Sequence, residues 1–292
     1  LRGINSQISD PRGLSELKIN RLSRKGRAVV CQSMSLHANE ISATQMASEL
    51  AYDLVTGTDE ETQHILENTV FLMIPCFNPD GQLMVTDWYY QYLGTEYEST
   101  LMPWLYHKYC GHDNNRDAVM LNLVESQYMA KIMFREWRPH VFQDHHEMGA
   151  YGPRLFVAPY CEPIHPHGDP LVWRELGWYG GHMAYKLEEA GLRGVIDGAL
   201  FGGWAHLGFH WMGNYHNVTS MLTETAQARH ATPIYIHPHQ LTGDGGTLRG
   251  MPHYKAQTNF PNPWPGGWWT LRDMMEQQLV ASKAVLHLSA RY

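Results

Sequence analysis

The apolar positions along the chain predict strands that alternate with helices. Continuous apolar runs at residues 28–36 and 69–77 are typical of strands that are covered on both faces. Between them, apolar residues recur every three or four positions over residues 43–54 and stop at Gly57, as on one face of a helix. The same reasoning predicts helices at 15–22, 118–136, 170–190 and 271–288, and strands at 140–144 and 218–222. This alternation predicts an α/β fold: a single domain with a central mixed, mostly parallel twisted sheet and helices on both faces.

Three segments are predicted to be irregular. The stretch "NPDG" at 78–81 has strong turn chemistry and is expected to close the second strand. Residues 88–109 are aperiodic and rich in Trp and Tyr, which predicts a long loop at an interface or a cleft rim. Residues 225–269 are rich in His, Pro, Gly and Trp and are also expected to be irregular. We divide the chain into a lead-in segment at 1–27 and one domain at 28–292.

Composition narrows the class of protein. The 292 residues carry 22 Lys and Arg against 29 Asp and Glu, a net charge of −7, so the basic surface that binds nucleic acid is not expected. The sequence has no stretch near the roughly 20 apolar residues that span a bilayer, and its first residues lack the basic-then-apolar pattern expected of a signal peptide. The four cysteines show no CxxC spacing, which argues against a zinc knuckle or a redox pair and favours small buried residues.

Candidate chemistry lies where the predicted strands end. His37 and Glu40 follow the first strand, His145 and His146 follow the strand at 140–144, and Glu224 follows the strand at 218–222. In open α/β sheets, reactive side chains gather beyond the carboxyl ends of the strands. We therefore expect these side chains to face one crevice.

The crevice residues could form a zinc site. Catalytic zinc takes three protein ligands, typically His and carboxylate, and keeps one position open. The pair His37 and Glu40, together with a distant His, would supply that set. The alternative for the pair is a carboxylate at a helix start beside a hydrogen-bonded His.

Five short motifs, in a fixed order along the chain, connect this predicted zinc site with a known protein family. They are "HANE" (37–40), "NPDG" (78–81), "DNNR" (113–116), "DHHEMG" (144–149) and "LTET" (222–225). With this set the chain resembles the zinc metallocarboxypeptidases of the carboxypeptidase A/B type over roughly residues 28–228. It is most similar to a bacterial, mostly uncharacterised branch in which a segment like "GPRLFVAPY" follows the third ligand.

The resemblance implies a ligand set for one zinc ion. His37 and Glu40 match the first two ligands of the family. The third ligand follows an Asp by two positions, which implies His146 rather than His145, since adjacent residues of a strand point to opposite sides. Asp113 matches the acid that orients the first ligand.

The resemblance also implies roles in catalysis. Asn115 and Arg116 match the pair that binds the terminal carboxylate of the substrate, a task that suits a planar guanidinium. Glu224 matches the catalytic carboxylate, which takes a proton from the attacking water and passes it to the leaving amine.

The chain departs from the family pattern at the arginine expected to stabilise the oxyanion. It has no Arg between Arg27 and Arg116, where better-known members carry one. Arg154 in "GPRLFVAPY" is the candidate replacement, with Lys108 as the weaker choice. Tyr215 does not fit the register of the substrate-capping tyrosine. The chain also begins nearer the first ligand than whole family domains do, so one or two early strands are expected to be missing.

These expectations define a leading function and two alternatives. The leading hypothesis is a zinc-dependent hydrolase that removes a C-terminal residue from peptides, with substrates that carry a free carboxylate. One alternative is a zinc amidase or deacylase that acts on N-acyl amino acids or cell-wall peptides. The other is an inactive zinc-bearing domain that binds peptide ends. The resemblance favours a secreted or periplasmic location.

Overall fold

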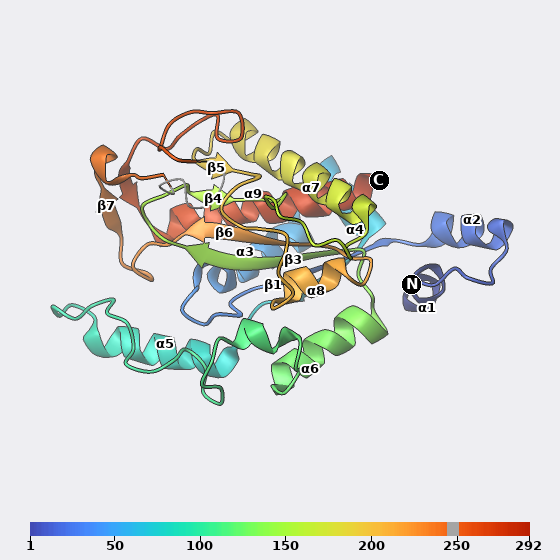
Figure 1. Cartoon of the computed structure of the whole chain (residues 1–292), viewed down its shortest axis with the longest axis horizontal. Coiled ribbons are helices and arrows are strands. Elements are labelled where there is room, and N and C mark those ends of the chain that lie inside the picture. The colour runs from blue at the N-terminus through green and yellow to red at the C-terminus, as the bar shows by residue number, and fades with distance from the viewer. Residues whose placement is uncertain (244–250) are drawn as a thin grey trace.

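A six-stranded mixed sheet forms the centre of the protein in the computed structural model, which describes residues 1–243 and 251–292 (Figure 1). The strand order is β2-β1-β3-β6-β4-β5. The first four strands in this order run parallel, β4 is antiparallel to β6, and β5 is parallel to β4. The strands are β1 (Ala28–Ser33), β2 (Thr69–Ile74), β3 (Val141–Met148), β4 (Leu155–Phe156), β5 (Val195–Ile196) and β6 (Thr219–Ala226). The predicted fold class is confirmed.

Helices cover both faces of this sheet. On one face lie α3 (Ser42–Thr56), α4 (Glu60–Asn68), α7 (Pro170–Glu189) and α9 (Leu271–Arg291). On the other face lie α6 (Val124–Lys131) and α8 (Phe209–Asn214), with α5 (Pro79–Tyr92) beside them (Figure 1). The helices α1 (Arg2–Ile8) and α2 (Glu16–Lys25) lie at the edge of this layered body, on the right of Figure 1, and the buried Asn5 of α1 donates a hydrogen bond to the Arg138 carbonyl oxygen at 3.2 Å. No helix in the described part of the chain is both long and apolar enough to cross a bilayer.

The segment "NPDG" starts a helix instead of forming a turn. Asn78 is the N-cap of α5, because its Oδ1 accepts a hydrogen bond from the Gly81 N–H at 3.0 Å, and Pro79 occupies the first helical turn. Asn and Pro are favoured at these helix positions as well as in turns, so the motif fits both structures. Part of the predicted aromatic loop, up to Tyr92, is therefore helical, and the irregular segment begins after it.

The remaining element predictions need smaller corrections. The helix expected at 118–136 is divided into a 3-10 turn (Asn114–Ala118), α6 and a π turn (Ile132–Glu136). The region 225–269 contains η3 (Pro238–Gln240) and a two-stranded antiparallel sheet of β7 (Ile234–Ile236) and β8 (Gly267–Trp269), and its residues 244–250 lie outside the described part. The strands β3 and β6 continue four residues beyond their predicted ends.

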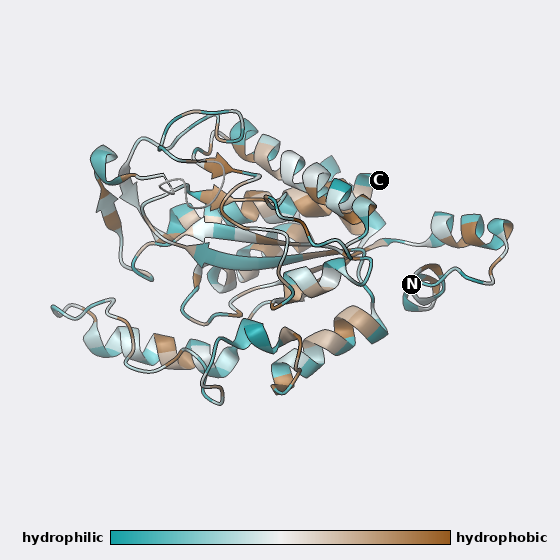
Figure 2. Cartoon of the chain, in the orientation of Figure 1, coloured by the Kyte–Doolittle hydropathy of each residue, from teal (hydrophilic) through white to brown (hydrophobic). Residues whose placement is uncertain are grey.

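The strand β3 is polar although it is central in the sheet, and Figure 2 shows it largely teal. Toward α9, its Gln143 accepts a hydrogen bond from Gln32 at 2.9 Å, and His145 is 2.9 Å from the Ser282 hydroxyl of α9. All four side chains are fully buried. Because buried polar groups require partners, this layer fixes α9 against the sheet and leaves the opposite face of β3 free for other contacts.

Candidate metal centre

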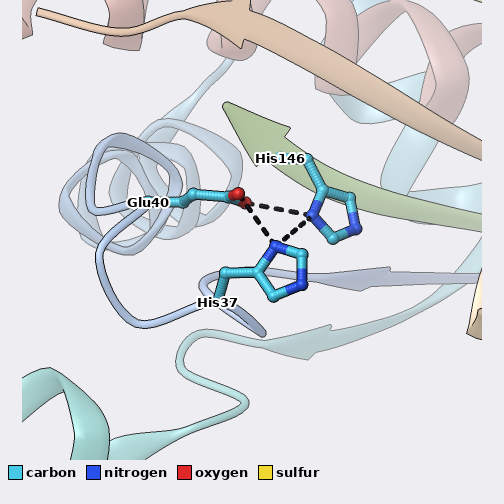
Figure 3. A group of neighbouring side chains, drawn as sticks. All are labelled: His37, Glu40 and His146. Atoms are coloured by element: carbon cyan, nitrogen blue, oxygen red, sulfur yellow. Dashed lines mark hydrogen bonds and ion pairs between the residues drawn. The ribbon is translucent and has the colours of Figure 1, made fainter. Parts of the chain in front are cut away.

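Three side chains from distant parts of the chain meet at one point beside the end of β1 (Figure 3). His37 lies in the loop after β1, Glu40 lies just before α3, and His146 lies on β3. The Glu40 carboxylate oxygens are 2.8 Å from Nδ1 of His37 and 3.0 Å from Nδ1 of His146, and the two Nδ1 atoms are 3.2 Å apart. The structure thus brings together the three residues that the motifs assigned to the metal.

The spacing of these atoms fits zinc. Ligand atoms at about 2.0–2.2 Å from a tetrahedral ion are roughly 3.3–3.5 Å from one another, slightly more than the separations observed here. Two imidazoles and one carboxylate are also a common zinc donor set. His37, Glu40 and His146 can therefore hold one zinc ion after a small outward movement.

A carboxylate contacts the outer nitrogen of each imidazole. Nε2 of His37 is 2.9 Å from Oδ1 of Asp113, as the motif predicts. Nε2 of His146 is 2.9 Å from Oδ2 of Asp144, a partner that the motif reasoning did not identify. Its position two residues before His146 on a strand is the sequence signal for it, because such residues share a face. These carboxylates hold both Nδ1 atoms toward the meeting point.

Charge at this centre shifts the pKa values of its groups. Burial lowers the pKa of His37, but the Glu40 and Asp113 carboxylates outweigh it and raise this pKa to about 9. Burial raises the pKa of Glu40, but the two imidazoles bring it to about 2. The geometry thus favours a negatively charged Glu40 that faces two positively charged imidazole rings. A divalent cation can supply this positive charge instead, because its binding displaces the protons of the two rings.

His145 occupies the opposite side of β3, as alternation along the strand predicts. Its Nδ1 is 3.0 Å from the Ser33 carbonyl oxygen, and it is completely buried in the polar layer against α9. It does not contact the three metal-site side chains.

A direct link joins the two segments that carry the candidate ligands. Oε1 of Glu147, the residue after His146, accepts hydrogen bonds from the Ser42 backbone N–H at 2.8 Å and from the Ser42 hydroxyl at 2.6 Å. Ser42 lies two residues after Glu40 and begins α3. The link therefore fixes the start of α3, and with it the loop that holds His37 and Glu40, against β3.

Glu224 lies beside the centre on β6, paired in register with His146 of β3. It is inside the strand rather than after it, which corrects its predicted position. Its side chain is largely buried and forms no hydrogen bond with the described residues. Burial is the main cause that raises the pKa of Glu224 to about 8. A carboxyl group that titrates near neutral pH can both accept and release a proton.

Asp113 connects the centre to Asn115 and Arg116. The Arg116 guanidinium is 3.2 Å from Oδ2 of Asp113 and donates to the Leu207 carbonyl oxygen at 3.0 Å, while its side chain stays 46% exposed. Asn115 is buried, and its Oδ1 accepts from the Phe209 N–H at 3.2 Å. The two residues lie beside His37, Glu40 and His146, and the exposed Arg116 guanidinium can bind the carboxylate of a ligand there.

Arg154 is not part of this site, so the structure contradicts its expected role. Its guanidinium lies 4.7 Å from the ring centroid of Trp264 and 4.8 Å from that of Trp269. It donates to the backbone carbonyl oxygens of Ala150 and Gly152 and has no exposed surface. A side chain without exposed surface cannot reach a substrate in this structure.

The weaker candidates lie elsewhere as well. Lys108 is directed to Asp80, 3.9 Å away, and to the ring of Tyr109. The Tyr215 hydroxyl donates to the Ala205 carbonyl oxygen at 2.9 Å. By contrast, Tyr106 contacts the edge of His37, with ring centroids 5.2 Å apart, although no motif had selected it.

The model of the zinc carboxypeptidase family matches residues 7–132. A comparison with curated proteins found no match.

Solved carboxypeptidase structures share the fold. A metallo-carboxypeptidase from Pseudomonas aeruginosa is 18% identical with a TM-score of 0.56, and covers 91% of this chain and 59% of its own. A metallo-carboxypeptidase from Burkholderia cenocepacia is 14% identical with a TM-score of 0.54, at 91% and 58% coverage. Carboxypeptidase A from Helicoverpa armigera is 12% identical with a TM-score of 0.53, at 93% and 63% coverage.

The chain thus resembles the zinc carboxypeptidases in sequence over residues 7–132 and in fold over most of its length, and the predicted resemblance is confirmed. It spans about three-fifths of the length of the solved structures named here. Zinc is the metal that the description of the family names, and it is the metal that the donor set fits.

The acid partner of His37 gives a testable prediction. Replacing Asp113 with Asn is expected to lower zinc affinity roughly 10- to 100-fold, because the imidazole loses the carboxylate that fixes its orientation and raises its basicity. Equilibrium competition against a coloured zinc chelator measures this change. Replacing the exposed Asp87 with Asn is the control, and equal affinity in the Asp113 and Asp87 variants would contradict the role of Asp113.

Proposed function

We propose that the protein is a zinc-dependent peptidase that removes the C-terminal residue of a peptide. The family and the fold support a metallopeptidase. The observation that carries the proposal is the meeting of His37, Glu40 and His146, with Glu224 next to His146 across two paired strands.

The residues of the chain divide the work of this reaction. His37, Glu40 and His146 would hold the zinc ion, which would supply a Lewis acid for the peptide carbonyl and lower the pKa of water toward neutral. Glu224 accepts a proton from the attacking water and delivers it to the leaving amine. Its buried position, which raises its pKa to about 8, suits both transfers.

Asn115 and Arg116 direct cleavage to the C-terminal end of the peptide. The exposed guanidinium of Arg116 lies on Asp113, which in turn contacts His37, so a carboxylate bound there lies close to the metal. A guanidinium binds a carboxylate through two parallel hydrogen bonds, which a terminal amide cannot accept equally well. We therefore infer that substrates need a free C-terminus.

A comparison of free and amidated peptides tests this function. A peptide with a free C-terminus should lose one residue in the zinc-loaded protein, and chelation should stop the reaction. The amidated form of the same peptide should be cut roughly 10- to 100-fold more slowly, the difference expected when hydrogen bonds to a charged group are lost. Equal cleavage of both forms would favour the amidase or deacylase alternative, and bound zinc without cleavage of either would favour the peptide-binding alternative.

A further inference from the structure

His210 is a buried histidine that forms no hydrogen bond with the described residues. It lies on α8 with 2% of its surface exposed, and both Nδ1 and Nε2 of its ring lack partners. Buried polar groups are nearly always hydrogen-bonded, because an unpaired one is unfavourable. The carboxylate of Asp144 faces this ring, with Oδ2 of Asp144 3.9 Å from Nδ1 of His210. The two residues are therefore close, but they do not yet form a hydrogen bond.

Asp144 is the fully buried carboxylate behind the metal-site residue His146. Its Oδ1 accepts a hydrogen bond from the Ser33 hydroxyl at 2.6 Å, and its Oδ2 is 2.9 Å from Nε2 of His146. Each carboxylate oxygen can accept two hydrogen bonds, so Oδ2 has a place for a second donor. Because Asp144 has no exposed surface, this donor has to come from a neighbouring side chain.

The start of α8 holds the His210 ring next to Asp144. The backbone N–H of Phe209, the residue before His210, donates to Oδ1 of Asn115 at 3.2 Å. The His210 ring also packs against the rings of Trp211 and Tyr160, with centroids 4.2 Å and 6.0 Å away. A hydrogen bond of this kind has a length of about 2.9 Å, so an approach of about 1 Å would join His210 to Asp144.

We propose that His210 is a positioning residue for the metal centre: its ring N–H donates to Oδ2 of Asp144 when zinc is bound and so holds Asp144 against His146. The inference rests on the zinc site of the proposed function and does not depend on which bond is cut. An imidazole in either protonation state has at least one N–H to donate.

Zinc binding itself would strengthen this chain of contacts. The three metal-site residues must move slightly outward to admit the ion, and for His146 outward means toward Asp144, because its Nε2 faces that carboxylate. The partner of a metal-bound histidine fixes the orientation of its ring and raises its basicity. His210 would support the same effect one residue further from the metal.

Zinc affinity tests this role without any peptide. His210→Phe keeps an aromatic ring but removes the N–H, and it should weaken zinc binding about five- to ten-fold, less than the roughly 10- to 100-fold that loss of a direct partner costs. His210→Asn places an amide N–H near the position of Nδ1 and should stay within about two-fold of the wild type. His216→Phe, at an exposed histidine just beyond α8, is the control and should not change the affinity. Equilibrium competition with a zinc chelator measures each value.

A double-mutant cycle with Asp144→Asn separates positioning from packing. This substitution keeps the shape of the side chain but removes its charge and one acceptor oxygen. His210→Phe should then have little further effect on zinc affinity, because the contact that it removes is already lost. An equal loss of affinity with and without Asp144→Asn would mean that His210 acts by packing alone, and this result would overturn the proposal. Unchanged affinity in His210→Phe would overturn it as well.

Metal content excludes a different role for His210. Asp144, His146 and His210 lie close enough to hold an ion of their own, so a second zinc ion that is lost in His210→Phe would make His210 a ligand and overturn the proposal. One ion per chain in the wild type and in both His210 variants is the expected result.

A spectroscopic measurement decides the outcome if His210→Phe does not fold by circular dichroism. NMR of the zinc-loaded wild type with ¹⁵N-labelled histidine, assigned with His210→Asn, should show a hydrogen-bonded ring N–H at His210, and a ring without one would overturn the proposal. The His210 effect on zinc affinity without peptide cleavage would leave this inference standing and refute the proposed function. Cleavage without the His210 effect would do the reverse.

Discussion

Replacing Glu224 with Gln is expected to reduce turnover about 10²- to 10⁴-fold while zinc stays bound. The amide has nearly the same shape as the carboxyl group but cannot take the proton from water or return it to the leaving amine, and this is the usual contribution of a general base. Glu224 is paired with His146 without being among the three residues at the meeting point, so metal content should remain near one ion per chain. Zinc analysis and kcat on a free-carboxylate peptide measure the two properties.

The control is the same substitution at Glu175 of α7, a carboxylate that contacts the other end of β6. Glu175 contacts Thr219 at the start of β6, and Glu175→Gln should keep turnover within a few-fold of wild type. Full activity in Glu224→Gln would refute the role of Glu224 as the base. Loss of zinc in that variant would instead show that Glu224 helps to hold the metal.

His146→Ala should weaken zinc binding, whereas His145→Ala should lower the stability of the fold. His146→Ala removes one of three donors and is expected to weaken zinc binding by more than the roughly 100-fold that the loss of an outer partner costs, with loss of activity. His145→Ala should keep the metal but lower the free energy of unfolding by about 2–4 kcal/mol, because it leaves a cavity and the unpaired Ser33 carbonyl and Ser282 hydroxyl groups. Zinc analysis and urea unfolding of both variants provide the comparison. Metal loss confined to His145→Ala would reverse the assignment.

The approach of the three metal-site residues could be predicted from the sequence for a simple physical reason. Parallel strands end at the same edge of a sheet, so His37, Glu40 and His146 had to be near one another once their strands were recognised. Alternation along β3 predicted that His145 and His146 lie on opposite faces, and the resemblance to the zinc carboxypeptidases selected His146 as the ligand. Fold class and the position of the site could therefore be predicted, because both depend on local sequence patterns that mark strands and helices.

Other features depend on contacts that a pattern cannot show. Arg154 was predicted to stabilise the oxyanion, yet it is enclosed by Trp264 and Trp269, more than a hundred residues further along the chain. The strands β3 and β6 were predicted too short because their polar site residues interrupt the apolar runs that mark strands. Asn78 begins a helix because the surrounding packing, and not its own preference, chooses between two allowed conformations.

The bond between Glu147 and Ser42 has a consequence for how an ion would enter. Since it fastens the loop of His37 and Glu40 to the strand of His146, the metal site is preorganised before the cation binds. Loading should then involve little reordering of the chain, so most of the ion's binding free energy is available for affinity and for the chemistry that follows.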